Sequence, residues 1–77
     1  MKGTGVRQDY TEAAGLYRLA ADQGHADAQF HMGLCYMDGI GVRQDYTDAV
    51  KWYKLAADQG HESAQIELVI AMVLAEE

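Results

Sequence analysis

The 77-residue sequence contains no proline, one cysteine and only six basic side chains. Without proline, no position is barred from a helix interior by its ring. The single cysteine, Cys35, excludes a disulfide within the chain and fits a reducing compartment. No leader-like apolar run opens the sequence, and the most apolar stretch, 66–75, is interrupted by Glu67 and too short to span a bilayer. We therefore expect a cytoplasmic protein that does not enter a membrane.

The charge balance is acidic, with twelve Asp and Glu against six Lys and Arg and a formal net charge of −6. The basic residues are scattered and form no run; they are Lys2, Arg7, Arg18, Arg43, Lys51 and Lys54. Such a surface repels a phosphate backbone. Nucleic acid and anionic membrane are thereby disfavoured as partners, and basic peptides or proteins are mildly favoured.

Residues suited to catalysis or metal binding are also sparse. Ser63 is the only serine, and Ala-Gln-Ile follows it, so no S-x-x-K pair exists. Cys35 lies on the apolar side of its predicted helix with no His or Asn placed beside it, which indicates a core thiol. His25, His31 and His61 lack the convergent ligands of a metal site, and we interpret them as polar turn residues. We expect no enzyme activity, no metal and no cofactor.

What the sequence has instead is an internal repeat. Residues 5–29 and 41–65 align at an offset of 36, and 18 of the 25 aligned positions are identical while 7 differ. A fixed period of this length is typical of stacked helical or solenoid repeats. A chain this short buries only about 60% of its unfolded surface, so stability is marginal and depends on the stacking.

Apolar residues within each block recur at helical spacing. The sequence predicts four helices, at about 10–23, 26–38, 46–59 and 62–75. Asp45 is expected to accept from the free backbone N–H groups of the third helix, and Asp9 to do the same for the first. Gly24 and Gly60 are expected to end helices in the left-handed conformation. Short loops predict antiparallel neighbours.

These residues resemble the Sel-1-like repeat, a relative of the tetratricopeptide repeat. The first half of the unit matches at Ala28, Met32, Gly33, Tyr36, Gly39, Gly41 and Val42. The second half matches at Asp45, Tyr46, Ala49, Trp52, Tyr53, Ala56, Ala57, Gln59 and Gly60. The first block matches from Gly5 to Gly24. The resemblance implies one domain over residues 1–77, an all-α right-handed α-solenoid of antiparallel helix hairpins with about two repeats.

One glycine carries a packing prediction of its own. Gly33 falls in the middle of a predicted helix, where glycine costs about 1 kcal/mol relative to alanine. We expect a neighbouring helix to lie too close there for a side chain. Ala49, Ala56 and Ala57 are its predicted small partners.

The resemblance also implies function: a non-catalytic scaffold or adaptor that binds a protein or peptide. Some cysteine-rich members of the family have been linked to β-lactamase-like activity, but their repeating cysteine pairs are missing here. In tetratricopeptide arrays the first helix of each unit lines the peptide-binding surface. The positions that the repeat leaves free on those helices are Asp27, His31, Leu34, Asp38, Glu67 and Ile70. We predict that they contact a partner; the alternative is an ordinary solvated helix face.

The resemblance fails after Gln65. Val69 stands at the place of Gly33, and the last helix, 62–75, is apolar nearly all round, whereas a terminal repeat normally has a polar outer face. Two explanations remain open. The chain is a piece or a damaged copy of a longer array, or a second copy covers the helix in a homo-oligomer. The predicted self-association residues are Ile66, Val69, Ile70, Val73 and Leu74.

Overall fold

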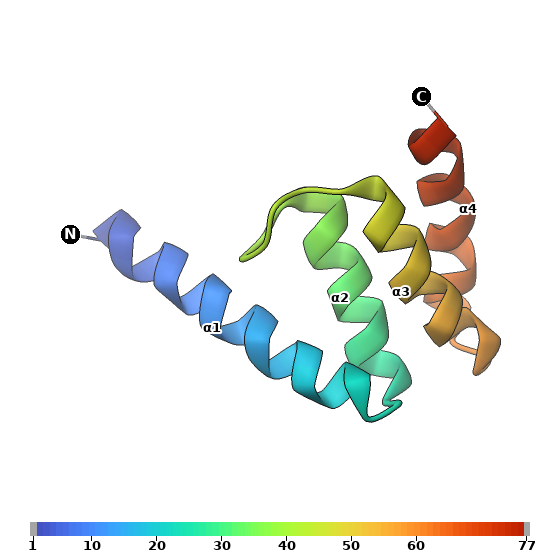
Figure 1. The fold of residues 1–77 in the computed structure, drawn as a ribbon, viewed down its shortest axis with the longest axis horizontal. Coiled ribbons are helices and arrows are strands. Elements are labelled where there is room, and N and C mark those ends of the chain that lie inside the picture. The colour runs from blue at the N-terminus through green and yellow to red at the C-terminus, as the bar shows by residue number, and fades with distance from the viewer. Residues whose placement is uncertain (1, 77) are drawn as a thin grey trace.

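The computed structural model describes the backbone of residues 2–76 and the side chains of residues 9–76. Within these residues the chain forms four α-helices, which alternate in direction (Figure 1). They are α1 (Lys2–Asp22), α2 (Ala26–Asp38), α3 (Tyr46–Asp58) and α4 (Glu62–Glu76). The predicted all-α class and the four helices are confirmed. The side chains of residues 5–8, at the start of the first repeat block, lie outside the described part.

The helix α3 begins and ends as its sequence predicts. The carboxylate of Asp45 accepts a hydrogen bond from the backbone N–H of Asp48 at 3.2 Å, which satisfies one free donor of the first turn. At the other end Gly60 has φ = 88°, a conformation that costs glycine little. The N–H of His61 then reaches back to the carbonyl of Ala56 at 3.2 Å, and the chain turns into α4.

The start of α1 differs from the prediction, because the helix begins at Lys2 rather than near residue 10. In the second block the equivalent loop depends on α2, whose carbonyls at Cys35 and Tyr36 accept from the N–H groups of Ile40 and Asp45, each at 2.9 Å. In the first block the backbone from Lys2 onward continues in helical hydrogen bonds instead of forming this loop. The prediction that Asp9 caps this helix is therefore wrong.

The main core lies where α3 packs between α2 and α4. Ala49, Tyr53 and Ala56 of α3 and Ala64 and Ala71 of α4 are all fully buried. Because four of these five side chains are alanine, the helix axes approach closely. The close approach expected at Gly33 is confirmed, but a Cβ built on this glycine would overlap the ring of Tyr53, rather than the predicted small partners Ala49, Ala56 and Ala57.

A smaller cluster joins α1 to α2. Ala21 of α1 packs with Ala28 and Met32 of α2, and the half-buried Trp52 of α3 leans on the same cluster. Beyond this contact much of the described surface of α1 is exposed, including the large apolar side chains Tyr10, Leu16 and Leu19. The loop after α2 reaches toward α1 (Figure 1), where Gly41 lies against the backbone of Tyr10.

Candidate functional site

The six residues predicted to contact a partner form what we call the recognition strip: Asp27, His31, Leu34, Asp38, Glu67 and Ile70. The first four project from α2 and the last two from α4. Asp27, Asp38 and Ile70 are exposed, whereas His31, Leu34 and Glu67 are half-buried. Leu34 packs against the core cluster of α3 and α4.

One carboxylate of the strip on α2, Asp38, and one on α4, Glu67, both act electrostatically on the phenol of Tyr53. Burial raises the pKa of Tyr53, and the negative charges of Glu67 and Asp38 raise it further. Both carboxylates therefore lie close enough to act on this phenol. The strip combines carboxylates at its edges with apolar groups between them, a surface suited to a segment that is both basic and apolar.

A histidine links the start of α2 to the start of α4. The ring Nδ1 of His61 accepts a hydrogen bond from the N–H of Ala64 at 3.1 Å, so its Nε2 carries the proton and donates to Asp27 Oδ1 at 2.9 Å. The His61 side chain is largely buried, while that of Asp27 is open to solvent. His61 thus caps α4 and holds the first strip residue in place.

Four rings continue from this link across the molecule in what we call the ring ladder: Tyr17, His31, Phe30 and His61. His31 stacks on Tyr17 of α1 with ring centroids 4.7 Å apart, and Phe30 stacks on His61 at the same distance. Phe30 and His31 are tilted at 5.8 Å. Ring pairs at such spacings are worth about 0.5–1.5 kcal/mol each beyond their buried area. The ladder therefore orients His31 from both sides.

Sequence reasoning missed this ladder, although one signal was available. Asp27 and His61 are 34 residues apart, close to the 36-residue repeat period. In a repeat stack, positions about one period apart lie side by side on successive units. The repeat period could therefore have predicted that Asp27 lies beside His61. Phe30, about one helical turn after Asp27, could have been placed beside His61 in the same way. The rotamers that stack the rings depend on packing and carry no sequence signal.

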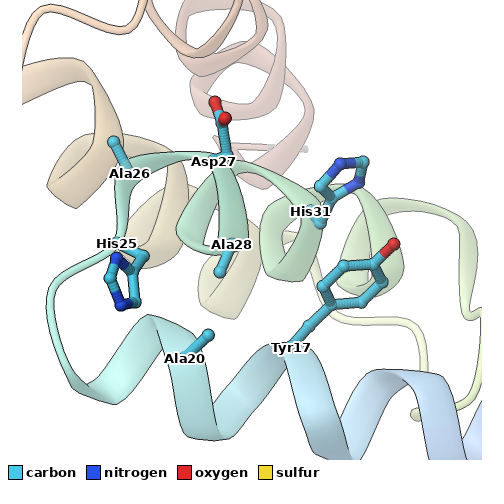
Figure 2. A pocket seen from close by; sticks show the side chains of 7 residues that line it. All are labelled: Tyr17, Ala20, His25, Ala26, Asp27, Ala28 and His31. Atoms are coloured by element: carbon cyan, nitrogen blue, oxygen red, sulfur yellow. The ribbon is translucent and has the colours of Figure 1, made fainter.

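An open groove runs between α1 and α2 beside the ladder. One part has a volume of about 620 Å³ and is lined by Tyr17, Ala20, His25, Ala26, Asp27, Ala28 and His31. The other part, about 260 Å³, is lined by Tyr10, Ala13, Ala14, Tyr17, His31, Leu34, Cys35 and Ile40. Figure 2 shows Tyr17 beside His31, Ala20 and His25 at the groove, and Asp27 directed away from α1.

The residues predicted for self-association lie on the outer side of α4. Ile66, Val69, Ile70 and Val73 are 45–64% exposed, whereas Leu74 is half-buried. Met72, which the prediction left out, is also exposed. The helix α4 therefore presents a continuous apolar stripe to solvent, whereas a helix face exposed to solvent is usually polar.

The described residues offer little to reaction chemistry. Cys35 is buried, and burial together with the charge of Asp38 raises the pKa of its thiol, which keeps it protonated and weakly nucleophilic. Among residues 2–76, no three His, Cys, Asp or Glu side chains gather as a metal site would require. Of the described helices, none has the length and apolarity needed to cross a membrane.

Antiparallel helices that stack in successive pairs define a helical-repeat protein. The model of the Sel1 repeat matches residues 1–25 and 26–61, so the chain belongs to the Sel1 repeat family. Repeats of this family are generally protein-interaction modules of a non-catalytic, scaffolding type. No curated protein and no solved structure matches the sequence significantly.

Proposed function

We propose that this chain is a non-catalytic adaptor and that its recognition strip binds a protein or peptide. The partner segment that suits the strip carries basic and apolar side chains, because the strip combines Asp38 and Glu67 with the half-buried Leu34 and the exposed Ile70 in a molecule of net charge −6. The segment would set its apolar side chains on Leu34 and Ile70 and its cations toward the carboxylates.

The observation that carries this proposal is the ring ladder. It holds His31 between Tyr17 and Phe30, and Asp27 is held by His61 at 2.9 Å. A surface whose side chains are already ordered loses less entropy on binding than a mobile one. Such ordering supports a binding role over an ordinary solvated helix face.

The test compares partner recovery by the wild-type chain and two strip variants. Proteins retained from cells of the source organism are quantified with the wild type, with His31→Ala plus Leu34→Ala, and with Glu67→Lys plus Ile70→Ala. Leu55→Ala, which changes an equally apolar and exposed residue of α3, is the matched control. A recovered partner is then purified and titrated against each variant. We expect it to bind the control with the wild-type affinity and each strip variant at least about tenfold more weakly. Unchanged affinity for both strip variants would refute the proposed role of the strip in binding. Circular dichroism verifies that both variants are folded.

A second function is favoured by the apolar stripe of α4: self-assembly through Ile66, Val69, Ile70 and Val73. Complete burial of one such side chain contributes about 1.5–3 kcal/mol. Because these side chains are 45–64% exposed, the four on each of two copies offer roughly 7–14 kcal/mol against an association cost of about 4–15 kcal/mol, so the assembly should be weak and dependent on concentration. Leu74 would contribute less because it is already half-buried.

Light scattering over a dilution series tests the assembly. We expect the average mass to rise with concentration for the wild type and to stay monomeric for Ile70→Glu plus Val73→Glu. Leu55→Glu, on α3, is the matched control and should assemble as the wild type does. A wild-type chain that remains a compact monomer through the micromolar range would rule the stripe out as a contact.

A further inference from the structure

The hydroxyl of Tyr53 is a buried polar atom without a hydrogen-bond partner within the described residues. The side chain is 0% exposed, its ring lies close against Gly33 of α2, and the ring centroid of Phe30 is 5.8 Å away. A polar atom buried in this way lowers the stability of the free chain. Phenylalanine would fill nearly the same space without that penalty, so packing alone does not account for the hydroxyl.

Glu67 of α4 lies on the side of this ring that faces away from α2. It stands one repeat period after His31, as Tyr53 stands one period after Tyr17. The rings of Tyr17 and His31 stack with centroids 4.7 Å apart. Because successive helix pairs of a repeat stack pack alike, Glu67 faces Tyr53 as His31 faces Tyr17. The negative charge of Glu67 acts on the Tyr53 phenol, which agrees with this placement.

Asp38 approaches the same phenol from α2. It follows Leu34 by one helical turn and Met37 by one residue, and both of these pack against the cluster that contains Tyr53. Its charge acts on the phenol as well. Neither Asp38 nor Glu67 makes an ion pair with any residue that the structure describes. Two unpaired carboxylates therefore flank one unpaired hydroxyl, and no cation from the described part of the chain balances them.

We propose that Tyr53, Asp38 and Glu67 form a subsite for one lysine side chain of the partner. This inference rests on the proposed function and names the partner residue that the strip selects. An ammonium group has three N–H donors and no acceptor, which matches one hydroxyl oxygen and two carboxylates. Its flexible four-carbon stem can lie along Leu34 and Ile70, the apolar residues of the strip on the same two helices as the carboxylates.

The hydroxyl is closed off from solvent in the free chain, so a side chain must turn aside to admit the ammonium. Glu67 is suited to this, because it is half-buried, has a flexible stem and makes no ion pair within the described residues. Arginine fits less well than lysine. Its guanidinium is a broad planar fork with five donors, whereas the subsite offers one buried oxygen at its floor. The subsite should therefore prefer lysine over arginine.

The experiment titrates the full chain with three short peptides and follows binding by NMR chemical shifts. The probes are acetyl-Leu-Lys-Leu-amide and its arginine and norleucine analogues. Blocked termini leave the central side chain as the only charge, and norleucine keeps the four-carbon stem without the ammonium. We expect saturable binding of the lysine peptide, with the arginine peptide at least about threefold weaker and the norleucine peptide at least about tenfold weaker.

Tyr53→Phe is the decisive variant, because it keeps the ring and is not expected to weaken the fold. It should reduce affinity for the lysine peptide about five- to tenfold and leave affinity for the norleucine peptide unchanged. Tyr17→Phe makes the same change at the equivalent repeat position and is the matched control, which should bind all three peptides as the wild type does. Equal effects of Tyr53→Phe on the lysine and norleucine peptides would show a packing effect and overturn the subsite.

The two carboxylates are tested by changes that remove charge and keep shape. Asp38→Asn and Glu67→Gln should each weaken binding of the lysine peptide about three- to tenfold. Glu12→Gln, at an exposed position of α1, changes the net charge by the same amount and should have little effect. An equal loss with Glu12→Gln would mean that only the net charge of the protein attracts the peptide, and would contradict the subsite.

Absence of saturable binding by the lysine peptide, or equal affinities of the lysine and norleucine peptides, would also overturn the subsite. Either result leaves the recognition strip standing, because the strip is tested with a recovered partner and with His31→Ala plus Leu34→Ala. Conversely, a recovered partner whose affinity is unchanged by both strip variants would refute the strip even if the lysine peptide binds at Tyr53. The two failures are therefore distinguishable.

Discussion

Two glycines in helix interiors have opposite consequences for stability. Gly33 is pressed against Tyr53, whereas a Cβ on Gly15 would meet nothing within 4 Å. Gly33→Ala should lower the free energy of unfolding by about 1–3 kcal/mol, because the overlap outweighs the gain in helix propensity. Gly15→Ala should raise it by about 0.5–1 kcal/mol. Urea denaturation of both variants gives the comparison, and a shift of the same sign in both would contradict the close approach at Gly33.

The hydroxyl of Tyr53 is buried without a hydrogen-bond partner within the described residues. Tyr53→Phe should therefore raise the free energy of unfolding at neutral pH by about 1 kcal/mol, because it removes an unpaired polar atom while keeping the ring. If the free energy of unfolding of Tyr53→Phe equals that of the wild type or falls below it, the Tyr53 hydroxyl must have a hydrogen-bond partner.

The same phenol predicts a loss of stability in alkali. Burial and the charges of Glu67 and Asp38 raise the pKa of Tyr53 above its ordinary value of 10.0. The unfolded chain releases this proton above about pH 10, while the folded chain retains it. The stability that the protonated Tyr53 contributes is therefore complete below about pH 10 and falls as the pH rises further. Urea midpoints at pH 8 and 10.5 should fall less for Tyr53→Phe than for the wild type; the raised pKa of Cys35 contributes a decline common to both.

At the scale of elements, Gln59 ties the end of α3 to the α1–α2 turn. Its amide donates to the Gly24 carbonyl and to Gln29 Oε1, both at 2.9 Å, and Gln29 is itself buried. Gln59→Ala should cost about 1–2 kcal/mol, because it leaves a buried amide oxygen unpaired. Gln23→Ala, at the equivalent exposed position of the first block, should cost less than about 0.5 kcal/mol. If Gln59→Ala and Gln23→Ala lower the free energy of unfolding equally in thermal or urea denaturation, the hydrogen bonds of Gln59 add nothing to stability.

The helices differ in how well their first and last residues could be predicted from the sequence. The bounds of α2 and α3 followed from local signals, namely the Asp45 cap and the helix-ending glycines, which act within a few residues. The start of α1 did not, because the loop predicted there needs carbonyls from a neighbouring helix. The strip residues were found as free positions of the repeat. The groove escaped prediction because it depends on which face of α1 remains uncovered.

For the whole molecule, the packing predicts a gradient of stability from α3 outward. The helix α3 lies between α2 and α4 and contributes three fully buried side chains, whereas the described part of α1 rests on Ala21, which packs on α2, and on Ala14, which lies beside Gly41. Repeat arrays gain stability from interfaces between neighbours, so the element with one interface opens first. Native-state hydrogen exchange should therefore show lower opening free energies for α1 than for α3. Ala21→Gly should lower those of α1 by about 1 kcal/mol and leave α3 nearly unchanged. An equal drop in both helices would mean that all four unfold as one cooperative unit, and that the α1–α2 contact is as strong as the core around Tyr53.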